Sequence, residues 1–258
     1  MAKMMKPVLL FASVALAVLL AGGVALAATI NCPNREGNLC VGTNSGDIMS
    51  GTDKADEMRG RGGPDSIAGD PGSDELYGGD GQDLLKGNKG KDTLGGGRGY
   101  DDLRGGTGDD TFDAGPGDAS YHFLDSWGRD IIEGTGPDGG RGYLHLHNNL
   151  STSAGVTVHL EPSSERAEVR SRSGENNTIN FTLAANIRRV HGTDQADVIR
   201  GSQRRDHLEG YPGSDTLFAQ DGKADRISCG DDNDTVYYDE GLDTFTFDDC
   251  ETKITTPP

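Results

Sequence analysis

The feature that most constrains this sequence is a nine-residue period that runs without insertion from Gly42 to about Gly117. An apolar residue follows two places after each recurring aspartate, from Met49 to Phe112. The aspartates are Asp47, Asp56, Asp65, Asp74, Asp83, Asp92, Asp101 and Asp110. A glycine begins each unit, and another lies three residues further on at Gly63, Gly72, Gly81, Gly90, Gly99 and Gly108. A disordered acidic linker is the alternative, but linkers do not keep an apolar residue at every ninth place.

The period predicts an all-β fold, a parallel β-solenoid. Glycine permits sharp turns and close backbone approach, and the residues after each aspartate alternate as a short strand does. Two units form one coil, and coils stack at about 4.8 Å, the spacing of paired strands. We therefore expect alternate aspartates to stack along opposite edges: Asp47, Asp65, Asp83 and Asp101 on one, and Asp56, Asp74, Asp92 and Asp110 on the other.

Stacked carboxylates repel one another unless a cation lies between them. Ca²⁺ takes roughly six to eight hard oxygen ligands, whereas Mg²⁺ requires a tighter octahedral geometry. The unit Gly78-Gly79-Asp80-Gly81-Gln82-Asp83-Leu84-Leu85-Lys86 resembles the nonapeptide of the RTX, or haemolysin-type calcium-binding, family. The resemblance implies a β-roll in which successive turns share each ion, with about six ions at most in the first block. It makes the eight aspartates and six glycines named above candidate calcium ligands.

A second, less regular block follows at residues 191–250. Its candidate ligands are Asp197, Asp206, Asp215, Asp234 and Asp243, and fewer glycines accompany them, so we expect weaker sites. One unit holds an extra residue and places Asp225 ten residues after Asp215. In the first block Ser45 and Lys54 replace glycines, and Ala119 stands where an aspartate is due. Ion sites should be incomplete at these places.

Residues 121–190 interrupt the period. Strand-like runs at 130–132, 143–147, 156–160 and 178–183 predict a continuing β-solenoid without regular ion sites. Residues 161–177 are polar and contain Pro162 and Gly174, which favours a solvated loop.

The composition agrees with a solenoid that binds a cation. Only 33% of the residues are hydrophobic and 40 are glycine, too little apolar side chain for an ordinary core of this length. A solenoid coil needs to bury only its own inward residues against its neighbours. The formal net charge of −18 makes nucleic acid an unsuitable partner and a divalent cation a suitable one.

Residues 1–27 have the features of a secretory signal peptide. Lys3 and Lys6 precede an apolar run at 8–21, and residues 25–27 form an A-x-A cleavage site. An uncleaved membrane anchor is the alternative, because the apolar character continues to Ile30. The signal peptide predicts a secreted bacterial protein that uses the general secretory route. Many proteins of the RTX family, which this sequence resembles, instead leave the cell through a dedicated exporter.

The sequence has four cysteines, which is consistent with export to an oxidising compartment where disulfides persist. Three pairings are possible, and proximity favours Cys32 with Cys40 and Cys229 with Cys250. Each bridge would close one end of the solenoid. A zinc site is the alternative, but no C-x-x-C spacing supports it.

We expect no enzyme and no catalytic residue, because the sequence has neither H-E-x-x-H nor G-x-S-x-G. His145 and His147 share one strand face and could hold a transition metal, although a solvent-facing pair is the simpler interpretation. Trp127 and Tyr143 could form a sugar-stacking platform or simply pack. The alternative function is therefore a small carbohydrate-active or carbohydrate-binding protein with its site in 121–190.

The expected organisation has six parts: a signal peptide (1–27), a disulfide-closed cap (28–41), a first calcium-binding block (42–120), a β-rich spacer (121–190), a second block (191–250) and a tail (251–258). The expected function is that of a secreted calcium-binding β-roll with a structural or surface-interaction role. Its expected partners are calcium ions and an extracellular or cell-surface glycan or protein, with no nucleic acid and no membrane span after signal cleavage.

Overall fold

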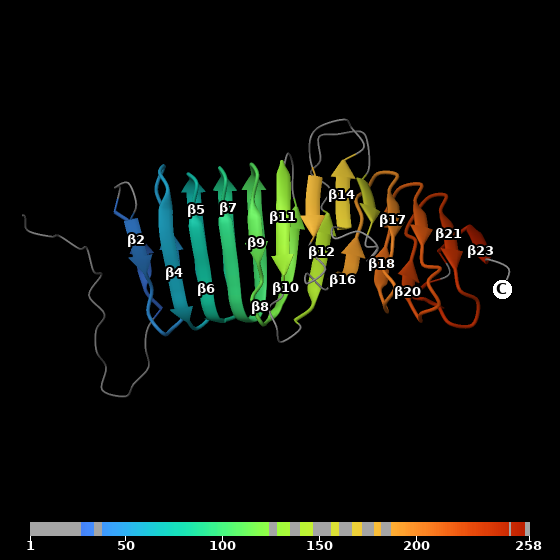
Figure 1. Ribbon diagram of the computed structural model, residues 1–258, viewed down its shortest axis with the longest axis horizontal. Helices are drawn as coiled ribbons and strands as arrows, with labels where there is room; N and C mark the ends of the chain where they lie inside the picture. Colours follow the sequence, from blue (N-terminus) through green and yellow to red (C-terminus); the bar gives the residue numbers. More distant parts are fainter. Residues whose placement is uncertain are drawn as a thin grey trace, which may run out of the picture.

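The computed structural model describes residues 27–33, 38–123, 128–134, 140–146, 156–159, 167–171, 178–181, 187–247 and 249–255. This described part contains 23 β-strands joined by turns. None of its segments is a helix long and apolar enough to span a membrane. The strands lie across the long axis of the molecule and follow one another along it in chain order (Figure 1), except for three strands of the spacer that occur in the reverse order. The predicted signal peptide, apart from Ala27, lies outside the described residues.

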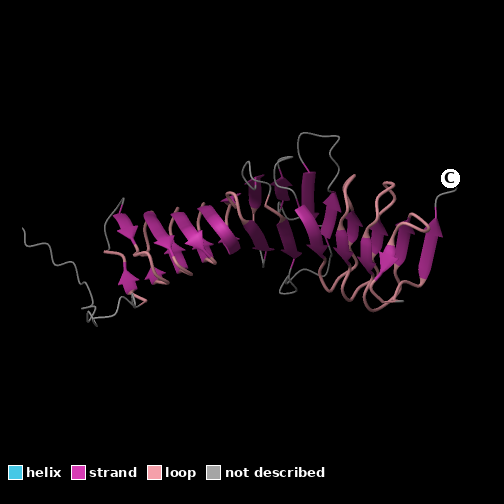
Figure 2. Cartoon of the chain, turned by 90° about the horizontal axis from the view of Figure 1, so that it is seen from below, coloured by secondary structure: helices cyan, strands magenta, loops and turns pink. Residues whose placement is uncertain are grey.

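The strands form two sheets, visible as two layers in Figure 2. Sheet A contains β1 (Thr29–Asn31), β3 (Ile48–Ser50), β5 (Ser66–Pro71), β7 (Leu84–Lys89), the second half of β8 (Thr93–Thr107), β10 (Asp118–Phe123), β12 (Gly142–Leu146), β16 (Ile187–His191), β18 (His207–Glu209), β20 (Arg226–Ser228) and β22 (Thr244–Phe245).

Sheet B begins with β2 (Asn38–Val41), β4 (Asp56–Gly62), β6 (Glu75–Gly81), the first half of β8, β9 (Thr111–Asp113), β11 (Arg129–Gly134) and β15 (Thr178–Phe181). It continues through β14 (Ala167–Ser171), β13 (Val156–His159), β17 (Val198–Arg200), β19 (Thr216–Phe218), β21 (Thr235–Tyr238) and β23 (Thr252–Thr255). Successive segments of the chain alternate between the two sheets through most of its length.

The strands of the first block pair in parallel with an offset of eighteen residues, as Met49 opposite Ile67 and Met58 opposite Leu76 show. This register brings the apolar residue of every unit into one narrow core. These side chains are at most 1% exposed: Met49, Met58, Ile67, Leu76, Leu85, Leu94, Leu103 and Phe112. The predicted parallel β-solenoid is therefore confirmed.

The spacer continues the solenoid, and the predicted strands at 130–132, 143–147, 156–160 and 178–183 are present as β11, β12, β13 and β15. One prediction was wrong. Part of the expected loop at 161–177 forms the strand β14, which pairs antiparallel with both β13 and β15. Its sequence, Ala167-Glu168-Val169-Arg170-Ser171, alternates as a strand does, but the polar residues around it masked that signal.

Both predicted disulfides are present. Cys32, just after β1, bonds Cys40 in β2, and Cys229, just after β20, bonds Cys250, just before β23. Each bond joins sheet A to sheet B at one end of the solenoid. No cysteine remains free, so the zinc alternative has no thiol ligand.

Candidate metal centre

The aspartates of the first block form two vertical stacks, one at the start of the sheet A strands and one at the start of the sheet B strands. We name them the Asp47 stack (Asp47, Asp65, Asp83, Asp101) and the Asp56 stack (Asp56, Asp74, Asp92, Asp110). Each backbone N–H donates to Oδ1 of the aspartate in the next coil: Asp47 to Asp65 at 2.7 Å, Asp65 to Asp83 at 2.8 Å and Asp74 to Asp92 at 2.9 Å. The predicted stacking on opposite edges is confirmed.

These carboxylates are buried, at most 3% exposed. Among the described residues, Oδ2 has no hydrogen-bond partner in Asp65, Asp74, Asp83, Asp92, Asp101 and Asp110. Burial, followed by the charges of neighbouring aspartates, raises the pKa of Asp65 to about 6 and that of Asp74 to about 7. A buried ionised oxygen without a partner is costly, so each stack requires positive charge or protons.

The glycines give the carboxylates room and let the coils approach. A Cβ on Gly78 would lie 2.3 Å from Oδ2 of Asp83. At Gly99, φ is +132° and a Cβ would lie 1.5 Å from the carbonyl oxygen of Gly81 in the preceding coil. A side chain at Gly78 would fill the space beside the unpartnered oxygen of Asp83, and one at Gly99 would clash with the backbone of the preceding coil.

These residues fit Ca²⁺. The donor set consists of carboxylate oxygens and turn carbonyls, which are the hard oxygen ligands that Ca²⁺ prefers. A cation between successive coils would partner the Oδ2 atoms that lack one. Such an ion would supply positive charge to a site that is otherwise entirely acidic.

Among the turns that the structure describes, four close differently, with Thr or Ser in the second place of the unit, directly after the glycine that begins it. Thr43 donates to Oδ2 of Asp47 from its backbone N–H at 2.6 Å and from its hydroxyl at 3.0 Å. The same arrangement joins Thr52 to Asp56, Thr193 to Asp197 and Ser202 to Asp206. We call these the hydroxyl turns. They begin both repeat blocks.

The other turns of regular nine-residue units, which we call glycine turns, have a residue of left-handed backbone conformation in the second place of the unit. The φ angle is +83° at Arg61, +113° at Gly79 and +72° at Tyr211. The aspartates that follow these residues (Asp65, Asp83 and Asp215) each have an unpartnered Oδ2. The two classes of turn therefore differ both in backbone and in whether Oδ2 of the carboxylate accepts a hydrogen bond from the protein.

Two acidic residues that extend the stacks were not predicted from the sequence. We call each stacked acidic residue a rung. Asp130 is fully buried and accepts the N–H of Asp110 at 2.8 Å, so the Asp56 stack continues into the spacer. Burial raises the pKa of Asp130 to about 9. Glu251 accepts the N–H of Asp234 at 2.8 Å. Asp130 lies twenty residues after Asp110 and Glu251 seventeen after Asp234, so a strict period missed both.

The second block forms two similar stacks. Asp197 donates to Asp215 at 2.7 Å and Asp215 to Asp234 at 2.8 Å, at the start of sheet B strands. At the start of sheet A strands, Asp206 donates to Asp225 and Asp225 to Asp243, both at 2.9 Å. Within the described chain, Oδ2 of Asp215, Asp225 and Asp234 again has no partner.

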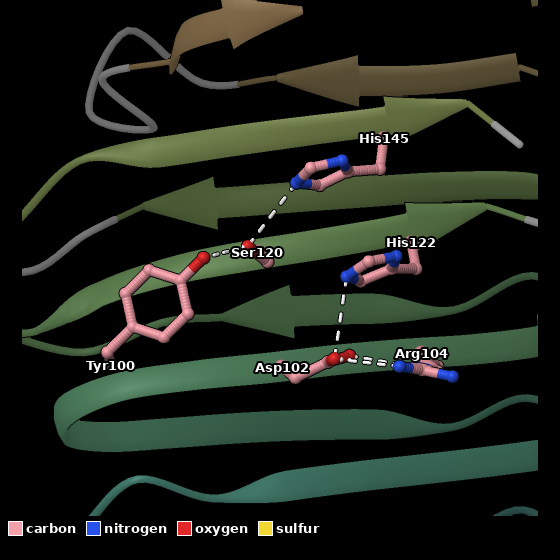
Figure 3. Close-up of polar contacts among 6 residues, drawn as sticks. All are labelled: Tyr100, Asp102, Arg104, Ser120, His122 and His145. Carbon is pink, nitrogen blue, oxygen red and sulfur yellow. Dashed lines mark hydrogen bonds and ion pairs between the residues drawn. The ribbon is translucent and has the colours of Figure 1, made fainter. Parts of the chain in front are cut away.

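A second polar feature lies on sheet A in and beside the spacer (Figure 3). The rings of His122 and His145 stack with centroids 4.6 Å apart, and His145 contacts His191 edge-on at 4.3 Å. Parallel strand pairing produces this row, because His122 faces His145 and His145 faces His191 in the register. The expected pair of His145 with His147 is not testable, because His147 lies outside the described residues.

Hydrogen bonds tie this row to neighbouring side chains. Ser120 Oγ lies 2.5 Å from the hydroxyl of Tyr100 and 3.5 Å from Nε2 of His145. Asp102 binds Arg104 through two bonds of 2.8 Å and lies 3.5 Å from Nε2 of His122. The expected platform of Trp127 with Tyr143 falls partly outside the described residues. Instead, the ring of Tyr143 lies 6.0 Å from that of Tyr100.

Comparison with known families tests the interpretation of the stacks. The family of RTX calcium-binding nonapeptide repeats, taken four copies at a time, matches residues 41–76, 50–85, 68–103, 86–118, 191–223 and 221–245. The matches cover more than half of the chain and both pairs of aspartate stacks. The chain belongs to the RTX calcium-binding nonapeptide repeat family.

The predicted family is thus confirmed, and membership implies a calcium-binding β-roll. RTX repeats are typical of extracellular bacterial proteins, and the RTX β-roll is typically structural rather than enzymatic. No curated protein matches this RTX chain. The spacer lies between the two matched regions.

Proposed function

We propose that this RTX protein is secreted by the general route and that Ca²⁺, held between its stacked turns, drives the folding of the solenoid. The observation that carries the proposal is the row of buried carboxylate oxygens without a hydrogen-bond partner. A divalent cation would offset their repulsion and replace the protons that burial otherwise favours. The folded rod would then serve a structural or surface-interaction role.

The proposed ligands are the aspartates of the repeats with the turn glycines named above, joined by Asp130 and Glu251. The glycine turns would hold the ions, because Oδ2 of their carboxylates has no donor among the described residues. The hydroxyl turns would need no ion to close, because Thr or Ser donates to Oδ2 of the aspartate, and that aspartate would still share an ion with the next coil. The proposed division of the chain is a signal peptide, a cap, two calcium-binding blocks with a spacer between them, and a tail.

The proposal makes folding and ion binding one event. At low free calcium the stacks repel and the chain stays extended, which suits export. Outside the cell, calcium neutralises the stacks and coils form on one another. Affinities of about 10⁻⁴–10⁻³ M, typical of extracellular modules, would suffice for this switch.

Far-ultraviolet circular dichroism of the mature chain tests the proposal directly. We expect a β signal in millimolar Ca²⁺ and its loss in a strong chelator at neutral pH. Equal concentrations of Mg²⁺ serve as the control and should not restore the signal. The same ordered β signal in chelator as in Ca²⁺ would refute calcium-driven folding.

Two isosteric variants test whether coils share ions. Asp83 lies between Asp65 and Asp101, so Asp83→Asn should weaken two sites. Asp47 ends its stack and already accepts hydrogen bonds from Thr43 and Ala28, so Asp47→Asn should weaken one site at most. Equilibrium dialysis with Ca²⁺ counts the ions lost. Equal losses in the two variants would contradict sharing.

A second candidate function is glycan binding on the sheet A face of Figure 3. The specific observation is the Tyr100–Tyr143 pair beside Ser120, His122 and His145, which combines aromatic surface with hydrogen-bonding groups. Tyr143→Ala should abolish binding in a screen of neutral and acidic oligosaccharides. Tyr77→Ala, at a half-exposed tyrosine on sheet B, is the matched control. A screen without a glycan that distinguishes the two variants would remove this candidate.

A further inference from the structure

The turn that precedes β20 departs from the regular repeat by one inserted residue. Asp206 and Asp225 are stacked rungs, yet they lie nineteen residues apart instead of eighteen. The insertion falls between Ala219 and Asp225. It affects Asp221, which occupies the third place of its unit. The residue in the third place of a regular unit, Asp80, points to solvent with 70% of its side chain exposed.

The insertion turns Asp221 toward the stack. One carboxylate oxygen each from Asp206, Asp221 and Asp225 lies within 4.8 Å of the other two. Asp206 and Asp225 are 2% and 1% exposed. Across the described residues, one other group of three potential ligands is this compact, but it contains the disulfide-bonded Cys229 and Cys250 and so offers no thiolate.

Two carboxylate oxygens in this cluster of three aspartates lack hydrogen-bond partners within the described chain. Oδ1 of Asp225 accepts the N–H of Asp206 at 2.9 Å, and Oδ1 of Asp221 accepts the N–H of Lys223 at 2.7 Å. The Oδ2 atoms of Asp221 and Asp225 are buried without a partner. In this turn, unlike in the regular ones, a third carboxylate, that of Asp221, therefore lies beside the stacked pair of Asp206 and Asp225.

The next coil fixes the conformation of the inserted turn. Oδ2 of Asp239 accepts the N–H groups of Asp221 and Gly222 at 2.9 and 2.6 Å. Asp243 accepts the N–H of Asp225 at 2.9 Å and that of Asp239 at 2.7 Å. Hydrogen bonds from main-chain N–H groups of the turn to the Asp239 carboxylate thus hold the turn against the stack. Oδ2 of Asp221 remains available to a ligand. Burial, with the charges of Asp221 and other aspartates, raises the pKa of Asp225 to about 7.

We propose that Asp206, Asp221 and Asp225 form a three-carboxylate calcium site that binds more tightly than the sites between regular coils. Calcium affinity rises with the number of charged ligands, and each regular pair of rungs supplies two carboxylates where this place supplies three. Ser202 holds Asp206 in position through its hydroxyl, at 2.8 Å from Oδ2. The inference rests on the proposed calcium function and adds to it a site of distinct affinity in the less regular block.

Calorimetric titration of the full mature chain with Ca²⁺ tests the site. The wild type should show one ion bound about tenfold more tightly than the others. Asp221→Asn, which keeps the shape of the side chain, should lose this tight class and leave the weaker classes unchanged. Asp80→Asn is the matched control, because it removes one carboxylate from the same place of a regular unit. It should retain the tight class.

The outcomes separate this inference from the proposed function. A single class of weak sites in the wild type would overturn the three-carboxylate site but leave calcium-driven folding in place. Loss of the tight class in both variants would also overturn it. A wild-type chain that takes up no Ca²⁺ would refute the proposed function as well. Circular dichroism of both variants at saturating Ca²⁺ checks that they fold, and Asp221→Glu should restore part of the tight class if Asp221→Asn loses it.

Discussion

Tyr121 shows how a single residue can break the pattern of an otherwise uniform core. It takes the inward place of the unit after Phe112 and packs edge-on against that ring with centroids 5.8 Å apart. Its side chain is fully buried. Within the described part of the chain its hydroxyl has no hydrogen-bond partner, and burial raises its pKa well above the usual range.

Tyr121→Phe should therefore stabilise the protein. Removing a buried hydroxyl without a partner should raise the free energy of unfolding by about 1 kcal/mol, because the hydroxyl no longer has to leave water. Urea unfolding in saturating Ca²⁺ measures the change. Tyr77→Phe, whose half-exposed hydroxyl donates to Glu75 at 3.3 Å, is the control and should shift stability by less than about 0.5 kcal/mol. A destabilised Tyr121→Phe would show that the hydroxyl is satisfied.

At the same scale, the stacked acidic residues at regular spacing were predictable and those at irregular spacing were not. The aspartates from Asp47 to Asp110 repeat at fixed spacing, so the sequence alone placed them in two stacks. Asp130, Glu251 and Asp221 belong to units whose length differs from nine, and only the folded chain brings them to the stacks. The row of His122, His145 and His191 joins three separate strands, which no spacing within one strand reveals.

At the scale of the elements, the two classes of turn differ in how they hold the aspartate carboxylate at the edge of the solenoid. A hydroxyl turn supplies donors to Oδ2 of its aspartate from within the chain, whereas a glycine turn leaves Oδ2 without a partner. Because hydroxyl turns begin both blocks, we expect each block to start with coils that depend less on a cation than the coils that follow. Such coils offer a formed edge on which the next coil can pair.

Thr193→Val should expose this division. Thr193 is fully buried, and its hydroxyl donates to both oxygens of Asp197 at 3.0 and 3.1 Å. Its loss should lower the free energy of unfolding by about 1–3 kcal/mol, because a buried carboxylate loses a donor. The number of bound Ca²⁺ ions should not change. Chemical unfolding and equilibrium dialysis measure the two quantities.

Thr216→Val provides the matched control for this variant. Thr216 lies in β19, half-buried, and its backbone N–H donates to the carbonyl of Asp197 at 2.9 Å. That bond survives the substitution, so stability and ion count should both stay near the wild type. A Thr193→Val chain that loses one Ca²⁺ ion would place the hydroxyl turn among the metal-dependent turns.

The elements of the spacer were predicted unevenly, for a physical reason. Apolar runs revealed β11, β12, β13 and β15, because strands against a core need inward apolar residues. Strand β14 was missed because polar residues surround its short alternating pattern, and it is the one strand of this region that pairs antiparallel with both of its neighbours, β13 and β15. Sheet A passes through the same region with direct parallel pairing of β12 and β16.

For the whole molecule, protons and calcium should act as alternatives. Burial, followed by neighbouring carboxylates, places the pKa of Asp74, Asp92 and Asp101 at about 7, above the usual value of 3.8. A raised pKa in the folded state means that the protonated form stabilises the fold. That stability is fully present below about pH 4 and is lost as the pH rises through about 7.

In calcium-depleted buffer the chain should thus be β-structured near pH 4 and lose that structure as the pH rises past 7. Circular dichroism across this range follows the change. In millimolar Ca²⁺ the signal should persist at pH 7 and above, because the cation replaces the protons. A calcium-free chain with the same β signal at pH 4 and pH 8 would contradict the raised pKa values.

The two disulfides determine which part of the chain would carry mechanical load. Tension applied at the carboxyl terminus reaches Cys250 and crosses the covalent bond to Cys229, so the segment between these residues is bypassed. At the other end the bond from Cys32 to Cys40 does the same. A pull on an anchored molecule is therefore delivered to the coils between Cys40 and Cys229, where most of the stacked aspartates lie, while the disulfide-closed loops at the two ends stay closed.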